Sequence, residues 1–132
     1  MRIFLDTNVL VSAFAARGLC AEVFELILLD HDLIVGQNVL RELEKALREK
    51  LKLSASRSRE VVEFVRNEVF LVVDVAESAQ VDVDADDALV LGEALAGQVE
   101  LFITGDAALL RLSSVGALQI ISPRQFWETL RS

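Results

Sequence analysis

Two aspartates stand at the ends of apolar runs, where an acid is costly unless it faces water, a partner or a cation. Asp6 directly follows residues 3–5 in "IFLDTNVLVSAF", and Asp106 follows residues 101–104 after one glycine in "LFITGDAALL". If both runs are parallel strands of one sheet, their carboxyl ends lie on the same edge, so we expect both carboxylates there. The simpler interpretation is that each aspartate caps the helix that follows it.

A third group of acids opens a predicted helix. In "DVDADDALVLGEAL", Asp84, Asp86 and Asp87 fall within four residues. Acids at a helix N-terminus complement the macrodipole, but three in so short a stretch exceed what capping needs, because like charges repel. A bound cation would offset that repulsion. Asp87 is the best candidate to point inward, since the apolar stripe of the helix begins beside it.

The fourth candidate lies on an amphipathic helix, in "NVLRELEKALREK". Glu42 and Glu44 border opposite sides of its apolar face, and their spacing alone does not separate them. Glu42 is nearer the start of the helix, and therefore nearer the carboxyl end of the predicted strand at residues 33–35. The commoner fate of such a glutamate is a solvated position on the surface.

Carboxylates that converge on one edge of a sheet raise one another's pKa values and destabilise the fold unless a cation neutralises them. Oxygen ligands of this kind suit Mg²⁺ or Mn²⁺. A zinc site is not expected, because the chain has one His and one Cys. The sequence therefore predicts a divalent-cation site made of Asp6, Glu42, Asp87 and Asp106.

The elements that must position these acids alternate along the chain. Aliphatic runs predict strands at residues 3–5, 33–35, 70–73, 101–104 and 118–121. Helical periodicity predicts helices at residues 9–15, 21–29, 38–50, 56–68, 86–96, 107–112 and 124–130, the last of them beginning beside the single proline, Pro123. This alternation predicts an α/β fold with a mainly parallel sheet of about five strands, whose ligands bind beyond the carboxyl ends of the strands.

The composition predicts a single cytoplasmic domain over residues 1–132. Hydrophobic residues make up 53% of the chain, which is enough for a substantial core and leaves a surplus that favours an interface with a partner or a second copy. The apolar runs are too short to span a membrane. The lone Cys20 excludes a disulfide framework, so we expect a reducing compartment.

The net charge of −8 argues against a simple nucleic-acid-binding protein, but the charge is uneven. Residues 41–66 hold 8 of the 13 basic residues and only 5 of the 21 acidic ones. One interpretation is a solvated helical face with pairs such as Glu44–Arg48. The other is a basic surface that flanks Glu42.

Several segments of the sequence resemble the PIN domain, a nuclease family that includes the VapC-like toxins of prokaryotic toxin–antitoxin pairs. The matching stretches, which span residues 4–130, are "FLDTNVLVSAF", "VLRELEKAL", "DADDALVLGEALAGQVELFITGDAALL" and "IISPRQFWETL". The resemblance implies a three-layer α/β/α sandwich and Mg²⁺-dependent cleavage of RNA.

The resemblance also implies roles for individual residues. The family's catalytic, metal-binding acids correspond to Asp6, Glu42, Asp87 and Asp106. This correspondence favours Glu42 over Glu44, while Asp84 or Asp86 could share the role of Asp87. Residues that would orient the carboxylates are Asn8 and Thr104. Basic residues placed to receive the RNA backbone are Arg41, Lys45 and Arg48.

The family implies an RNA substrate, a homodimer and, for toxin members, an antitoxin protein that covers the active site; RNA processing outside such a pair is an equal rival. Two other functions compete. A haloacid-dehalogenase-like phosphatase needs an acid two residues after Asp6, where this chain has Asn8. A catalytically silent PIN-like binding module is the second alternative, but all the candidate acids are present.

Overall fold

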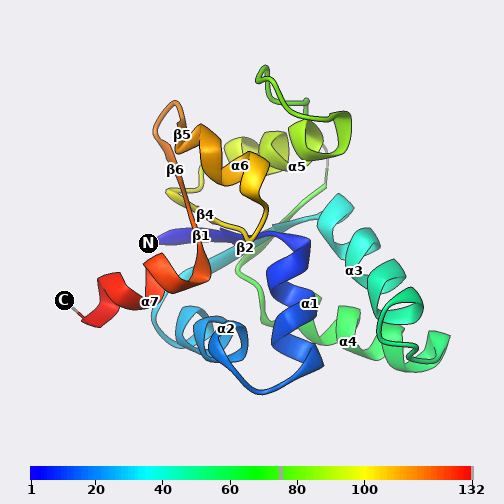
Figure 1. The fold of residues 1–132 in the computed structure, drawn as a ribbon. Helices are drawn as coiled ribbons and strands as arrows, with labels where there is room; N and C mark the ends of the chain where they lie inside the picture. Colours follow the sequence, from blue (N-terminus) through cyan, green and yellow to red (C-terminus); the bar gives the residue numbers. More distant parts are fainter. Residues whose placement is uncertain (75, 132) are drawn as a thin grey trace.

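The computed structural model describes residues 1–74 and 76–131, and strands and helices alternate as the sequence predicts (Figure 1). In chain order the elements are β1 (Arg2–Leu5), α1 (Thr7–Ala15), α2 (Leu19–Asp30), β2 (Asp32–Gly36), α3 (Gln37–Glu49), α4 (Ala55–Glu68), β3 (Leu71–Val73), α5 (Ala85–Ala96), β4 (Leu101–Ile103), α6 (Ala107–Leu112), β5 (Ser114–Val115), β6 (Leu118–Ile121) and α7 (Pro123–Arg131). Every predicted element is present, with small differences in its bounds.

The sheet has six strands in the order β3-β2-β1-β4-β6-β5. β1 pairs in parallel with β2 and with β4, and the β2–β3 and β4–β6 pairs are also parallel. β5 pairs antiparallel with β6 across a tight turn in which Gly116 has a φ of +59°, a conformation that glycine adopts readily. The mainly parallel sheet is therefore confirmed, and the prediction of about five strands missed the short strand β5.

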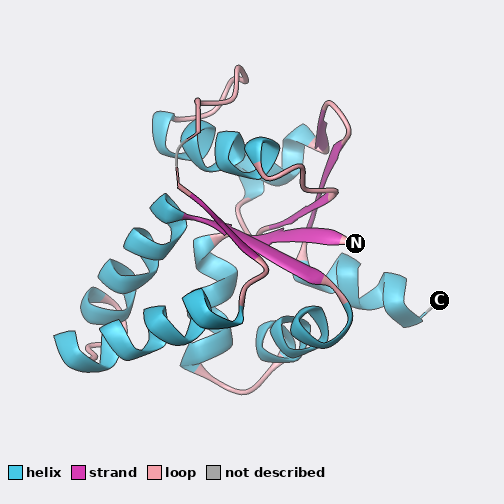
Figure 2. Ribbon diagram, turned by 180° about the vertical axis from the view of Figure 1, so that it is seen from behind, coloured by secondary structure: helices cyan, strands magenta, loops and turns pink. Residues whose placement is uncertain are grey.

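Helices cover both faces of the sheet, which gives the three-layer sandwich (Figures 1 and 2). α5 and α6 lie over one face, and α1, α2 and α7 lie over the other. α3 packs against α1 and α4, so it flanks the carboxyl end of β1. The centre of the sheet is filled by Phe4 of β1 and Phe102 of β4, which are fully buried and stack with 5.2 Å between ring centroids.

The last helix shows how local sequence sets an element's start. Ser122 Oγ accepts a hydrogen bond from the backbone N–H of Gln125, and Gln125 Oε1 accepts one from the backbone N–H of Ser122. This reciprocal capping box precedes a proline at the first helical position, as the sequence predicts for Pro123. α7 is thereby docked on α2, on the face of the sheet that also carries α1.

The strand order brings the two strand-end aspartates together. β1 and β4 are neighbours in parallel register, with Leu5 opposite Ile103, and the backbone N–H of Asp6 donates to the carbonyl oxygen of Ile103 at 3.0 Å. The chain runs from β1 to β2 and β3 on one side and from β4 to β6 on the other, so the strand order reverses between β1 and β4. Open α/β sheets bind ligands at such a point.

Some of the apolar surplus remains at the surface, where Leu29, Phe64 and Phe70 are among the exposed large hydrophobic side chains. In the described part of the chain, no helix has the length and apolar character needed to cross a membrane.

Candidate active site

Asp6 is held in one orientation by three hydrogen bonds at the carboxyl end of β1. Its Oδ1 accepts from the backbone N–H of Thr7 at 2.9 Å. Its Oδ2 accepts from Thr104 Oγ1 at 2.7 Å and from Asn8 Nδ2 at 3.0 Å. Asp6 is only 6% exposed, and this burial raises the pKa of its carboxyl group, while the hydrogen bonds act in the opposite direction.

Asn8 and Thr104, the residues predicted to orient the carboxylates, link Asp6 to the start of α6. Asn8 Oδ1 accepts from the backbone N–H of Gly105 at 2.9 Å, and Thr104 Oγ1 accepts from the backbone N–H of Asp106 at 3.0 Å. Both side chains also bond to Asp6 Oδ2, so they tie the ends of β1 and β4 to each other. The geometry of the Asp6 carboxylate therefore depends on both strand ends.

Asp106 caps α6, and Asp84 caps α5. Asp106 Oδ1 accepts from the backbone N–H groups of Ala108 and Leu109 at 2.8 and 3.3 Å, as the simpler interpretation of this residue predicted. Asp84 Oδ1 accepts from the backbone N–H of Asp87 at 2.8 Å. Asp84 therefore has the capping role in its acidic cluster, which leaves the Asp87 side chain free of that role.

Glu42 is oriented by Thr7, a contact that the sequence did not suggest. Thr7 Oγ1 donates to Glu42 Oε2 at 2.8 Å and joins the first turn of α1 to α3. Glu44 lies on the other border of the apolar face of α3, as predicted, and lines a different groove. Glu42 and Glu44 therefore line different cavities.

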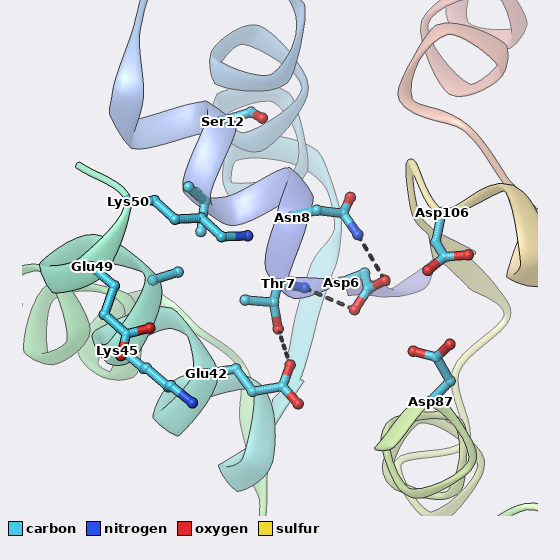
Figure 3. Close-up of a pocket in the computed structure, with 12 residues that line it drawn as sticks. Asp6, Thr7, Asn8, Ser12, Glu42, Lys45, Glu49, Lys50, Asp87 and Asp106 are labelled. Atoms are coloured by element: carbon cyan, nitrogen blue, oxygen red, sulfur yellow. Dashed lines mark hydrogen bonds between the residues drawn. The ribbon is translucent and has the colours of Figure 1, made fainter. Parts of the chain in front are cut away.

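The four predicted acids line one cavity of about 530 Å³ at the carboxyl ends of β1 and β4 (Figure 3). The carboxylates of Asp6, Asp87 and Asp106 point toward a common space, and Glu42 lies at its edge. The opposite wall comes from α3 and the residue after it, with Lys45, Glu49 and Lys50 as its charged side chains. Asp84 and Asp86 are exposed and are not part of the lining. We call this the acid cavity.

The acids in the cavity repel one another. Burial raises the pKa of Asp87, and the charges of Asp84, Asp106 and Asp6 add to this effect, so that the pKa reaches about 6. Burial also raises the pKa of Glu42, against the hydrogen bond from Thr7, and the charge of Asp6 raises it further. Without a neutralising partner, burial and mutual repulsion destabilise the ionised form of these carboxyl groups.

A second groove, of about 690 Å³, runs along the outer face of α3 and shares Lys45 and Glu49 with the acid cavity. Arg41, Lys45 and Arg48 all line it, and we call it the basic groove. Among the described residues, the salt bridge found is Arg66–Glu63 at 3.6 Å, so the predicted Glu44–Arg48 pair is not formed. The basic side chains of this groove therefore form no salt bridges with the described residues.

The donor chemistry of the acid cavity fits a hard divalent cation, although the acids do not form a closed cage. In the part of the chain that the structure describes, no group of three His, Cys, Asp or Glu side chains is arranged to hold a metal ion. Mg²⁺ usually keeps several waters and binds through one or two carboxylates, so it does not need such a cage. Asp6 and Asp87, which face each other across the cavity with raised pKa values, are the side chains that would hold it.

Residues 2–108 of the sequence match the PIN domain family. This chain belongs to the PIN domain family. The matched part includes all four acids of the cavity together with Asn8 and Thr104, and the resemblance predicted from the sequence motifs is confirmed. A comparison with curated protein sequences finds no significant match.

Solved structures of VapBC complexes have the same PIN fold. VapBC2 from Rickettsia felis, bound to a DNA fragment from its promoter, has a TM-score of 0.68 at 14% identity, with 92% of this chain and 98% of that chain covered. VapBC-1 from nontypeable Haemophilus influenzae has a TM-score of 0.65 at 17% identity, covering 94% and 99%. DNA-bound VapBC from Salmonella typhimurium has a TM-score of 0.66 at 18% identity, covering 93% and 98%.

Thr7 is a polar residue of the acid cavity of this PIN domain that was missed from the sequence. Thr7 carries a weak signal, because a hydroxyl next to a strand-end acid at the start of a helix is placed to bond a neighbouring carboxylate.

Proposed function

We propose that this PIN domain is a Mg²⁺- or Mn²⁺-dependent endoribonuclease that hydrolyses phosphodiester bonds at the acid cavity. The observation that carries the proposal is that Asp6, Glu42, Asp87 and Asp106, from four different elements or their ends, line one cavity. PIN domains are typically nucleases, and membership of that family supports the same reaction class.

In the proposed reaction, Asp6 and Asp87 would hold the cation, and Glu42 or Asp106 would accept the proton from the attacking water. When bound, a divalent cation supplies the positive charge that acidifies a water molecule and neutralises the phosphate oxygens. Asp6 is preorganised for its role, because donors from both strand ends fix its two oxygens. Glu42 is fixed in the same way by Thr7.

The RNA backbone would run from the acid cavity into the basic groove. Lys45 lines both, so the phosphate next to the one held at the cation would lie beside Lys45. Arg41 and Arg48 extend the positive surface along α3. Contacts of this kind supply most of the affinity for a nucleic-acid backbone and weaken as salt is added.

The proposed activity is tested with a fluorescently labelled single-stranded RNA, Mg²⁺ and the variants Asp6→Asn and Glu42→Gln. We expect each to lower kcat by at least about 100-fold. Glu44→Gln is the matched control on the same helix, since Glu44 lies outside the acid cavity and lines the basic groove, and its kcat should equal that of the wild type. Cleavage by Asp6→Asn at the wild-type rate would reject the site and leave a binding module as the better explanation.

The fold shared with the VapBC complexes favours a role as the toxin of a toxin–antitoxin pair. The exposed apolar side chains favour an interface with a second copy in a homodimer or with an antitoxin. Expression in a bacterial host should stop growth with the wild type and not with Asp6→Asn. Normal growth despite RNA cleavage in vitro would instead support RNA processing. Light scattering on the purified protein measures its molar mass and so tests whether it is a homodimer.

A further inference from the structure

Glu93 of α5 is a buried carboxylate that takes no part in the acid cavity. It is 1% exposed, and its Oε2 accepts from the backbone N–H of Asn38 at 2.9 Å and from Asn38 Nδ2 at 3.1 Å. α3 begins after Gly36, which has no side chain to cap the helix. Glu93 therefore supplies the cap of α3 from another helix.

The space for this carboxylate exists because residue 36 is glycine. A Cβ atom on Gly36 would lie 2.0 Å from the carboxyl carbon of Glu93. The backbone of Gly36 is ordinary, with φ of −103° and ψ of 158°, so close approach and not conformation requires the glycine. Burial raises the pKa of Glu93, and Oε1 is one of the buried polar atoms without a hydrogen-bond partner in the described part of the chain.

The bond to Glu93 also sets which way the Asn38 amide faces. Because Nδ2 donates to Glu93, Oδ1 is turned away from the core, and there it accepts a hydrogen bond from Arg41 Nη2. Asn38 and Arg41 are three residues apart, so they are neighbours on one face of α3. An unbroken set of contacts thus runs from Glu93 in the core, through Asn38, to the guanidinium group at the basic groove.

We propose that Glu93 is a positioning residue for RNA binding, which through Asn38 fixes the guanidinium group of Arg41 to receive a phosphate. The inference rests on the proposed ribonuclease function. An exposed arginine loses side-chain entropy when it binds a phosphate, and an arginine that is already held loses less. Release of Arg41 is therefore expected to weaken RNA binding about three- to tenfold.

The alternative is that Glu93 and Asn38 only hold the first turn of α3. That role would act on Glu42, one turn further along the helix, and its loss would lower kcat. Loss of a phosphate contact made equally in the ground state and the transition state raises KM and leaves kcat unchanged. The two roles therefore differ in which kinetic constant changes.

The experiment is a double-mutant cycle with Asn38→Ala and Arg41→Ala, measured as KM and kcat for Mg²⁺-dependent cleavage of a single-stranded oligoribonucleotide. We expect each single variant to raise KM about three- to tenfold with kcat unchanged. The double variant should match Arg41→Ala, because Asn38 acts through Arg41. Multiplying effects in the double variant, or a loss of kcat with unchanged KM in Asn38→Ala, would overturn the proposal.

Glu93→Met adds a test in which the sign of the effect decides, because methionine has a similar length and offers Asn38 no carboxylate oxygen. Removal of a negative charge by itself should tighten RNA binding, and Glu44→Met is the control that measures this effect at the basic groove. The proposal expects Glu93→Met to raise KM, and a KM at or below that of Glu44→Met overturns it. If Glu93→Met does not fold, the Asn38–Arg41 cycle still decides. If the wild-type protein does not cleave RNA, the proposed function itself is rejected. If the wild type cleaves RNA but the Asn38–Arg41 cycle gives one of the contrary results, only this inference is rejected.

Discussion

The acid cavity should make the metal-free protein less stable at neutral pH than a variant that lacks one of its charges. Asp87→Asn is the chosen change, because the pKa of Asp87 rises from its ordinary value of 3.8 to about 6, through burial and the neighbouring charges of Asp84, Asp106 and Asp6. A carboxyl group whose folded pKa is raised binds its proton more tightly in the folded state. Stability therefore falls as pH rises from about 4 to about 6 and stays low above that range.

The size of the effect follows from this shift. Each pKa unit corresponds to about 1.4 kcal/mol, so the upper limit is about 3 kcal/mol. Asp87 is only partly buried, and solvent screening reduces that figure. Its position in the first turn of α5 contributes a favourable helix-dipole interaction of roughly 0.3–1 kcal/mol, which asparagine loses. We expect Asp87→Asn to gain about 1 kcal/mol at pH 7, or about 3–5 °C in Tm.

The assay is thermal unfolding followed by circular dichroism in EDTA, at pH 7 and at pH 4. The gain should be present at pH 7 and nearly absent at pH 4, where the wild-type carboxyl group is largely protonated. Asp82→Asn, an exposed residue outside the acid cavity, is the control and should show no such pH dependence. Addition of Mn²⁺ should raise the Tm of the wild type more than that of Asp87→Asn. If Asp87→Asn is less stable than the wild type at pH 7 in EDTA, charge repulsion does not dominate this site.

Three further changes test separate parts of the structure. Thr7→Val removes the hydroxyl that donates to Glu42 and should lower kcat about tenfold with KM unchanged in the RNA cleavage assay, whereas an unchanged kcat would deny Thr7 this role. Phe102→Ala should cost about 3–5 kcal/mol in urea unfolding, because its fully buried ring stacks on Phe4; a cost below about 1 kcal/mol would contradict that packing. Ser122→Ala should cost about 1 kcal/mol in the same assay, through loss of the cap of α7, and an equal loss in Ser113→Ala would make the effect nonspecific.

The fold was predictable because its signals are long and repeated. Runs of aliphatic residues flanked by helical periodicity specify parallel strands with crossover helices, and the strand and helix positions follow. β5 was missed because Ser114–Val115 is too short to show any periodicity. Its partner β6 was recognised without it, since three of the four residues of Leu118–Ile121 are aliphatic.

Part of the candidate site follows from the sheet alone. Parallel strands end on one edge, so Asp6 and Asp106 were expected together, and their adjacency follows from the pairing of β1 with β4. The choice between Glu42 and Glu44 was different. Both border the same apolar face, and the cavity that each one lines depends on how α3 packs against α1, which helical spacing does not contain. The contact between Thr7 and Glu42 could not be predicted either, because it also depends on how α3 packs against α1.

Two carboxylates are buried in the part of the chain that the structure describes, and they illustrate why a costly residue in a core calls for a specific explanation. Both have pKa values raised by burial, yet Asp6 has three donors and an open cavity beside it, while Glu93 has two donors and a sealed surrounding that Gly36 makes possible. Burial without full pairing is unfavourable for stability. Hence stability alone does not account for either group. The proposed roles explain both positions. Asp6 faces the space where a cation would bind, and Glu93 holds Asn38, the residue that fixes Arg41 at the basic groove.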